Sequence, residues 1–215
     1  MTQLIEALSY PFVQRAIAAG VMISLCAALL GVILVLKQYS LIGHGLGDVG
    51  FASTSLAVAL GLPVMAVSIP IVVIAACLIM FWSQRSKTGG DTAIGMVATG
   101  ALSIGVIITA MSSGFNVDVN GYMFGSILAM SREDVIFSVV LSIVILVLFV
   151  VFYNRLFLIT FDENFAKASG IRVGFYQFLI ALLTALTVVM GMRMMGSLLI
   201  SSLIIFPAVI ARKLV

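Results

Sequence analysis

Charged residues are scarce in this chain: they make up 9% of its 215 residues, against 63% hydrophobic residues, and the mean hydropathy is +1.30. A soluble globular domain carries roughly 25% charged residues. So few charges cannot cover the surface of a soluble protein, which excludes soluble enzymes and predicts an integral membrane protein. The net charge of +3 comes from basic residues scattered between apolar stretches, so it does not indicate a nucleic-acid partner.

Histidine and cysteine are also scarce. The chain has one histidine, His44, and two cysteines, Cys26 and Cys77, both deep inside apolar runs. Without a Cys-x-x-Cys spacing, a zinc knuckle and a redox pair are excluded, and we expect both cysteines to be packing residues. The phosphate-binding pattern Gly-x-x-x-x-Gly-Lys-Ser/Thr is absent too. Any ATP-driven function must therefore draw on another polypeptide.

Long apolar stretches dominate what is present. A membrane-spanning helix needs about 20 apolar residues, and uncharged stretches of that order cover 16–36, 92–117, 135–154, 173–192 and 194–211. A longer stretch, 49–82, is broken by Gly61-Leu62-Pro63 into two spans, the first starting near Gly45. The predicted fold is all-α: one polytopic transmembrane helical bundle of about seven spans over 1–215. Segment 119–131 is too short to cross and is predicted to be a half-inserted or surface helix.

The basic residues predict the orientation. With the N-terminus outside, eight of the eleven fall on the inner side, where lysine and arginine accumulate: Lys37, Arg85, Lys87, Arg155, Lys167, Arg172, Arg212 and Lys213. The outer side then holds three: Arg15, Arg132 and Arg193. Aromatic residues at the inner ends of spans, such as Trp82, agree with this orientation. We therefore predict an N-out protein with a cytoplasmic loop at 155–172.

One ionisable pair lies at the mouth of the second span. His44 and Asp48 are four residues apart, so on a helix they share one face. An imidazole and a carboxylate suit borderline divalent cations such as Zn²⁺, Mn²⁺ or Fe²⁺. The glycines Gly43, Gly47 and Gly50 would let another helix approach closely. The alternative is a glycine-packed helix start whose His44 and Asp48 are merely solvated at the interface.

The inner loop 160–173 is the most polar segment. Asp162 and Glu163 suit the positive N-terminal end of a short helix, and Gly170 suits its end. Ala166 and Gly170 are four apart, so both small residues are predicted to face a cytoplasmic partner. An ordinary connecting loop is the alternative interpretation.

Two further segments are predicted to be structural. Asp91 follows Gly89-Gly90 and is expected to cap the helix that starts there. Met192, Met194 and Met195 flank Arg193; thioethers can bind Cu(I), but adaptable packing is the commoner role of methionine.

The order of several motifs resembles the permease subunits of bacterial ATP-binding-cassette importers for zinc, manganese and related metals. These motifs are Ser40-Leu-Ile-Gly with its glycine-rich helix, Asp91-Thr-Ala-Ile-Gly, Gly121-Tyr-Met-Phe-Gly-Ser-Ile-Leu, Phe161-Asp-Glu-Asn-Phe-Ala-Lys-Ala-Ser-Gly-Ile and Gly196-Ser-Leu-Leu-Ile-Ser-Ser-Leu-Ile-Ile-Phe-Pro-Ala. They cover nearly the whole chain. The resemblance implies a multi-pass protein of the bacterial cell membrane that dimerises, binds a cytoplasmic ATPase and receives metal from an extracytoplasmic binding protein.

The chain departs from the family pattern in two ways. The family more often has Asp, Ser and His where this chain has His44, Gly47 and Asp48, so the ligand types are exchanged but a two-ligand face is kept. Family members also continue beyond the Phe206-Pro-Ala region with at least one more span, and a C-terminally truncated chain is one interpretation.

The sequence hypothesis is a permease that passes divalent metal ions inward, with His44 and Asp48 contacting the metal and Asp162, Glu163, Ala166 and Gly170 docking the ATPase. ATP hydrolysis is expected on the separate ATPase, so the chain is not itself an enzyme and binds no cofactor of its own. The alternatives are a permease for metal chelates (haem, cobalamin or siderophores) and an ion-coupled secondary transporter. Secondary transporters often carry inverted repeats and mid-membrane charges, and the sequence shows neither clearly.

Overall fold

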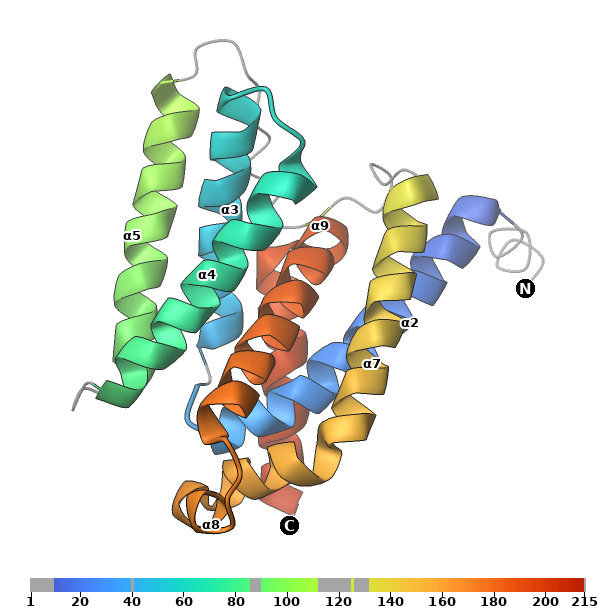
Figure 1. The fold of residues 1–215 in the computed structure, drawn as a ribbon. Coiled ribbons are helices and arrows are strands. Elements are labelled where there is room, and N and C mark those ends of the chain that lie inside the picture. Colours follow the sequence, from blue (N-terminus) through green and yellow to red (C-terminus); the bar gives the residue numbers. More distant parts are fainter. Residues whose placement is uncertain (1–9, 40, 86–89, 112–124, 126–131, 215) are drawn as a thin grey trace.

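The computed structural model describes residues 10–39, 41–85, 90–111, 125 and 132–214. The described residues form helices and no strand (Figure 1): α2 (Pro11–Leu36), α3 (Ile42–Ala59), α4 (Val64–Arg85), α5 (Gly90–Met111), α7 (Arg132–Phe161), α8 (Glu163–Ala168) and α9 (Val173–Leu214). All but the short α8 are long helices. This confirms the predicted all-α bundle.

Helix α9 is the centre of the bundle. It contacts α2, α3, α4, α7 and α8, and Figure 1 shows α2 and α7 on one side of it and α3, α4 and α5 on the other. Every residue in its stretch 179–192 is apolar, a glycine or a threonine, and most of these residues are buried. A helix that is apolar all round is stable when other helices surround it, so this stretch lies in the middle.

Among the described residues, five helices are long and apolar enough to cross a membrane: Phe12–Leu36, Val64–Trp82, Asp91–Met111, Arg132–Phe161 and Val173–Ala211. The predicted count of about seven includes two more segments. One is α3, which is 18 residues long and largely buried. The other arises because α9 is interrupted at Gly196, whose φ of 82° and ψ of 161° are not helical. The number of spans thus depends on how α3 and the two halves of α9 are counted.

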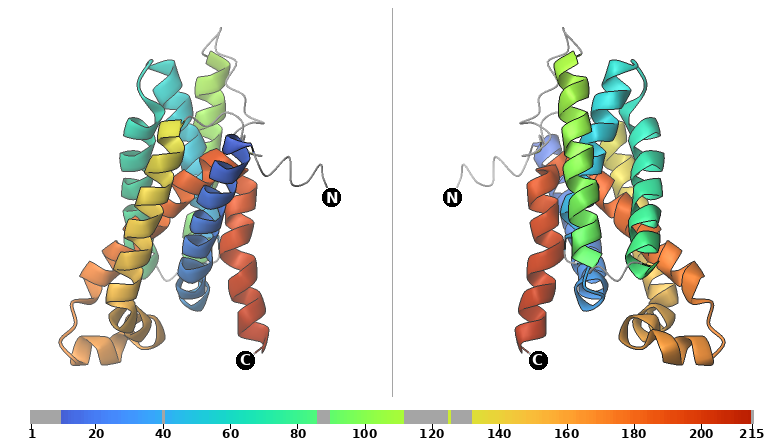
Figure 2. Two further views of the ribbon diagram at one scale, coloured as in Figure 1. Left: turned by 90° about the vertical axis from the view of Figure 1, so that its right-hand side faces the viewer. Right: turned by 90° about the vertical axis from the view of Figure 1, so that its left-hand side faces the viewer.

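Turns place the loops at alternate ends of the bundle. Gly61, with a φ of 65°, ends α3, and the backbone N–H of Leu62 donates to the carbonyl of Ala57 at 2.9 Å, so the predicted break is confirmed. Figures 1 and 2 show this turn at one end, with α8 and the end of α9 at the opposite end. The predicted orientation places the loop that carries α8 on the inner side of the membrane. Which end faces the cytoplasm stays a prediction.

The segment 119–131 lies outside the described residues except for Gly125, so its predicted surface helix is not tested. Gly125 lies against the interruption of α9: a Cβ at residue 125 would come within 2.5 Å of the Gly196 nitrogen. Two glycines therefore meet where α9 changes direction.

Candidate metal-binding site

Helix α3 is held in the bundle by close contacts at its glycines. A Cβ at Gly45 would lie 2.6 Å from Ile94 Cγ2 of α5, and a Cβ at Gly47 would lie 3.0 Å from Ser197 Cβ of α9. A Cβ at Gly50 would meet Met192 Cε at 2.5 Å. The prediction that Gly43, Gly47 and Gly50 admit another helix is confirmed, and α9 is that helix for all three. Small residues let the α3 backbone approach its neighbours this closely.

The structure brings His44 and Asp48 together on α3, as the spacing predicted. His44 Nε2 lies 3.7 Å from Asp48 Oδ2, so the two side chains face each other without forming a hydrogen bond. The His44 side chain is 49% exposed and that of Asp48 is 10% exposed. The pair therefore lies at the edge of the protomer, where an ion or a second chain can reach it.

The chain provides two candidate ligands, His44 and Asp48, at this place. Within the described ranges, no group of three or more His, Cys, Asp or Glu side chains is placed to hold a metal. Protein-bound divalent metals take four or more ligands. A complete coordination shell at His44 and Asp48 therefore needs hydroxyls, waters or a second copy of the chain.

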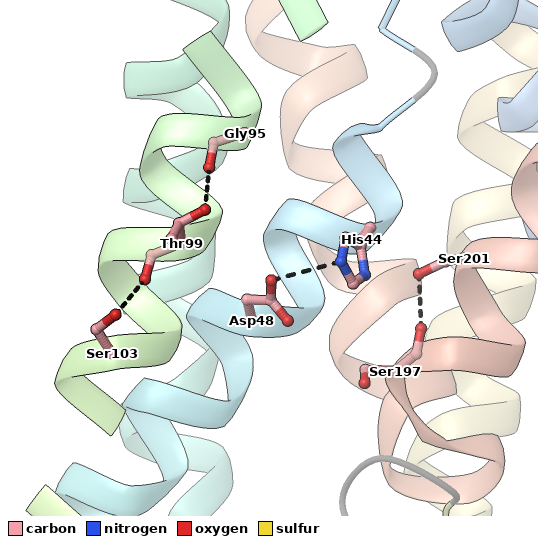
Figure 3. A network of polar contacts seen from close by, with 7 residues as sticks. All are labelled: His44, Asp48, Gly95, Thr99, Ser103, Ser197 and Ser201. Atoms are coloured by element: carbon pink, nitrogen blue, oxygen red, sulfur yellow. Dashed lines mark hydrogen bonds and ion pairs between the residues drawn. The ribbon is translucent and has the colours of Figure 1, made fainter. Parts of the chain in front are cut away.

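Hydroxyl groups from two other helices surround the pair. Figure 3 shows Thr99 and Ser103 of α5 on one side of His44 and Asp48, and Ser197 and Ser201 of α9 on the other. Sequence reasoning missed all four, because they lie more than 50 residues from His44 along the chain. Serine and threonine are common in membrane helices as packing residues, so no local signal distinguished them.

Asp91 has a structural role, but not the predicted one. It lies in the first turn of α5, and its Oδ1 accepts a hydrogen bond at 3.1 Å from the backbone N–H of Leu41, the residue that precedes α3. We expected Asp91 to cap its own helix. The carboxylate instead ties the start of α5 to the start of α3, at a residue that lies three positions before His44. This contact links helices 50 residues apart in sequence, which capping patterns do not reveal.

The methionine cluster packs the core. Met192 and Met194 are buried, and Met192 lies against Gly50. Arg193 between them reaches α7, where its Nη1 lies 3.1 Å from Asp134 Oδ1. The packing interpretation of the methionines is confirmed.

Helix α8 has the predicted start and end. Asp162 is its N-cap, with the side chain accepting from the Phe165 N–H at 2.9 Å. Gly170 follows its end with a φ of 77°, and the Ile171 N–H donates to the Ala166 carbonyl at 3.1 Å. This pattern satisfies the last carbonyls of the helix. The six-residue helix is thus closed at both ends by residues that the sequence pattern identified.

Of the four predicted docking residues, Ala166 faces inward and Glu163 is half-buried. Ala166 is fully buried within the chain, so it does not share an exposed face with Gly170, which is exposed. Glu163 Oε2 accepts from Gln177 Nε2 of α9 at 3.1 Å, and its Oε1 lies 2.8 Å from Lys167 Nζ. These contacts join α8 to α9.

Lys37, just after α2, belongs to the same end of the molecule. Burial lowers the pKa of the Lys37 amine below its usual value, and the Glu163 carboxylate acts in the opposite direction. Glu163 therefore interacts with groups from two long helices besides its own.

Comparisons with known proteins agree with the motifs. The sequence profile described as the ABC 3 transport family matches residues 9–215. The chain is 29% identical to the manganese transport system membrane protein MntC of Halalkalibacterium halodurans, over 96% of this chain and 70% of that protein. It is 31% identical to the high-affinity zinc uptake system membrane protein ZnuB of Haemophilus influenzae, over 92% of this chain and 76% of that protein.

A solved structure has the same fold. It is described as PsaBC from Streptococcus pneumoniae in complex with Fab, and one of its chains aligns with a TM-score of 0.83 and 29% identity. The alignment covers 98% of this chain and 76% of the other. The overall fold is therefore shared with that structure over 98% of this chain.

Proposed function

The chain belongs to the ABC 3 transport family, and from this membership we propose that it moves divalent metal ions, such as zinc, manganese or iron, into the cell past His44 and Asp48. It is a multi-pass protein of the cell membrane and the permease of a metal-ion importer. The observation that carries the proposed site is the 3.7 Å pair of His44 and Asp48 on a helix start that is otherwise glycine and apolar.

The pair is suited to a passing ion rather than to a fixed one. Neutral imidazole and ionised carboxylate give one nitrogen and one oxygen ligand, and a second copy of the chain would add the same again. Four ligands from two facing protomers make an N₂O₂ set that suits Zn²⁺ or Mn²⁺. A site shared by two chains can open and release its ion, whereas a closed cage of four ligands from one chain would hold it.

The energy source is expected to lie on a separate cytoplasmic ATPase subunit, because the sequence has no phosphate-binding loop. We place its docking surface at α8. The helix is polar and mostly exposed, with Phe165 projecting outward and Glu163 connected to α9. Asp162 and Gly170 then fix the shape of the docking helix, while Ala166 anchors it from inside. An extracytoplasmic metal-binding protein would deliver the ion at the opposite end.

A permease for metal chelates is the second candidate that the sequence left open. His44 and Asp48 favour bare ions, because ionisable ligands 3.7 Å apart can share one ion directly. A haem or a cobalamin would instead need a wide, largely apolar path. An ion-coupled secondary transporter is not favoured, since the family is one of ATP-binding-cassette transport proteins.

The site is tested by uptake of radiolabelled Mn²⁺ and Zn²⁺ in cells that lack their own importers. His44→Gln and Asp48→Asn should each lower uptake by at least about tenfold, as loss of a ligand weakens metal binding. Ser24→Ala is the matched control, because Ser24 is a half-buried polar residue on α2 whose hydroxyl donates to the Val21 carbonyl of its own helix. Wild-type uptake rates in both site variants, at normal insertion and ATPase co-purification, would place the metal path elsewhere.

The docking surface is tested by co-purification with the ATPase. Gly170→Leu should abolish it, because the side chain projects from an exposed position and the φ of 77° disfavours any side chain. Gly174→Leu is the control: Gly174 lies nearby with equally open space but helical backbone. Equal co-purification of the two variants would exclude α8 as the dock.

A further inference from the structure

The serines of α9 lie in register with the two candidate ligands of α3. Gly43 and Gly47 immediately precede His44 and Asp48, and each lies against a serine. A Cβ at Gly43 would come within 3.5 Å of Ser201 Cα, and a Cβ at Gly47 within 3.0 Å of Ser197 Cβ. Ser201 is therefore at the level of His44, and Ser197 at the level of Asp48.

The hydroxyl protons around the pair are already committed. Ser201 Oγ donates to the Ser197 carbonyl at 2.6 Å, and on α5 Thr99 donates to the Gly95 carbonyl and Ser103 to the Thr99 carbonyl, both at 2.8 Å (Figure 3). A hydroxyl that donates its only proton to its own helix keeps its lone pairs for another group. These oxygens therefore present lone pairs, which attract cations, to whatever lies next to them.

Ser197 differs from the other three hydroxyls. It is 7% exposed, and its hydroxyl has no hydrogen-bond partner among the described residues. Figure 3 draws it on the side of α9 that faces Asp48. Among the described residues, no fully buried side-chain oxygen or nitrogen lacks a hydrogen-bond partner, so the Ser197 oxygen keeps some access to its surroundings. It is therefore open to a group that approaches from the side of Asp48.

We propose that Ser197 and Ser201 are specificity-determining residues of the ion path, whose hydroxyl oxygens bias it toward hard divalent cations such as Mn²⁺ over Zn²⁺. The inference rests on the proposed function of His44 and Asp48. Zn²⁺ is satisfied by four ligands, with nitrogen and sulfur among those it favours. Mn²⁺ suits oxygen ligands in an octahedral shell. Adding hydroxyl oxygens to a shared N₂O₂ set raises both the number of ligands and the share of oxygen, which benefits Mn²⁺ more.

The test is competition between radiolabelled Mn²⁺ and Zn²⁺ for uptake by the complete transporter. The ATPase and the metal-binding protein are the same in every sample, so a changed Mn²⁺-to-Zn²⁺ ratio comes from the permease. Ser197→Ala and Ser201→Ala should each lower this ratio by about tenfold, the effect of losing one polar contact to a charged group. Ser201→Cys replaces oxygen with softer sulfur at nearly the same size, and it should lower the ratio further by favouring Zn²⁺.

Ser202→Ala is the matched control. Ser202 is the next residue of the same helix and also donates to its own helix, at 3.0 Å to the Leu198 carbonyl, but it is half-buried whereas Ser201 is buried. Its ratio should equal that of the wild type. If the alanine variants fail to insert, the near-isosteric Ser201→Cys decides the matter.

An unchanged ratio in the inserted Ser197 and Ser201 variants would overturn the inference. His44→Gln and Asp48→Asn are measured in parallel to separate the two hypotheses. If they lose transport while the serine variants keep the wild-type ratio, the role of the serines is wrong and the metal pair stands. If they transport normally, the metal pair itself is wrong, and the inference fails with it.

Discussion

Replacing Gly31 with alanine should separate α2 from the second half of α9, residues 197–214. Gly31 lies directly against the α9 backbone: a Cβ there would overlap the Ile204 carbonyl oxygen and lie 3.0 Å from the carbonyl carbon and 3.3 Å from Cα. Atoms of this kind settle at about 3.5 to 4.0 Å. Because the obstacle is backbone, no side-chain rotation relieves the overlap, and the helices must move apart by roughly 1 Å.

The cost follows from two opposing effects. Overpacking a tight interface costs about 1–3 kcal/mol, and an immovable backbone obstacle favours the upper end of that range. Alanine stabilises a helix interior by about 1 kcal/mol relative to glycine. The net loss is therefore about 2 kcal/mol, which corresponds to a fall in Tm of about 4–8 °C for a chain of this length. Metal uptake should fall as well, because Ile204 also packs against Gly43, beside His44.

Thermal unfolding of the purified protein in detergent measures the first effect, and uptake of radiolabelled metal measures the second. Gly174→Ala is the control, since a Cβ at Gly174 meets no atom within 4 Å; it should leave uptake unchanged and should not lower Tm, because alanine favours the helix over glycine. A Gly31→Ala protein with the Tm and uptake of the wild type would refute the close approach of α2 and α9.

Three further predictions concern Asp91, Asp162 and the orientation in the membrane. Asp91→Ala should lower the free energy of unfolding by about 1 kcal/mol, because it removes the acceptor for the Leu41 N–H at the start of α3. Asp91→Asn keeps an acceptor oxygen and should lose less, so its Tm should lie between those of the wild type and the alanine variant. Asp162→Ala should destabilise α8 by about 1 kcal/mol and weaken co-purification of the ATPase, because the N-cap is lost. Recovery in Asp162→Ser would attribute the loss to capping, whereas wild-type co-purification by the alanine variant would contradict the prediction. In intact cells a membrane-impermeant thiol reagent should modify Asn116→Cys and spare Ser86→Cys, two positions outside the described residues; the reverse pattern would invert the topology.

Much of this protein could be predicted from spacing along the chain. The apolar stretches determined the all-α membrane fold, since a helix in lipid must satisfy its backbone internally and needs about 20 apolar residues. Asp162 and Gly170 marked the ends of α8, and Gly61 marked the end of α3, because capping is decided within a few residues. The His44–Asp48 pair likewise follows from a four-residue interval on one helix.

The tertiary structure alone decided which distant residues share a place. Asp91 bonds the start of α3 rather than its own helix, Ala166 turns inward, and Ser197 and Ser201 lie beside His44 and Asp48. The Asp91 contact joins residues 50 positions apart, and Ser197 and Ser201 lie 149 and 157 positions from Asp48 and His44, so these neighbours depend on how helices distant in the sequence pack against one another. That packing is set by the shapes of many small side chains together, so no local pattern in the sequence encodes it.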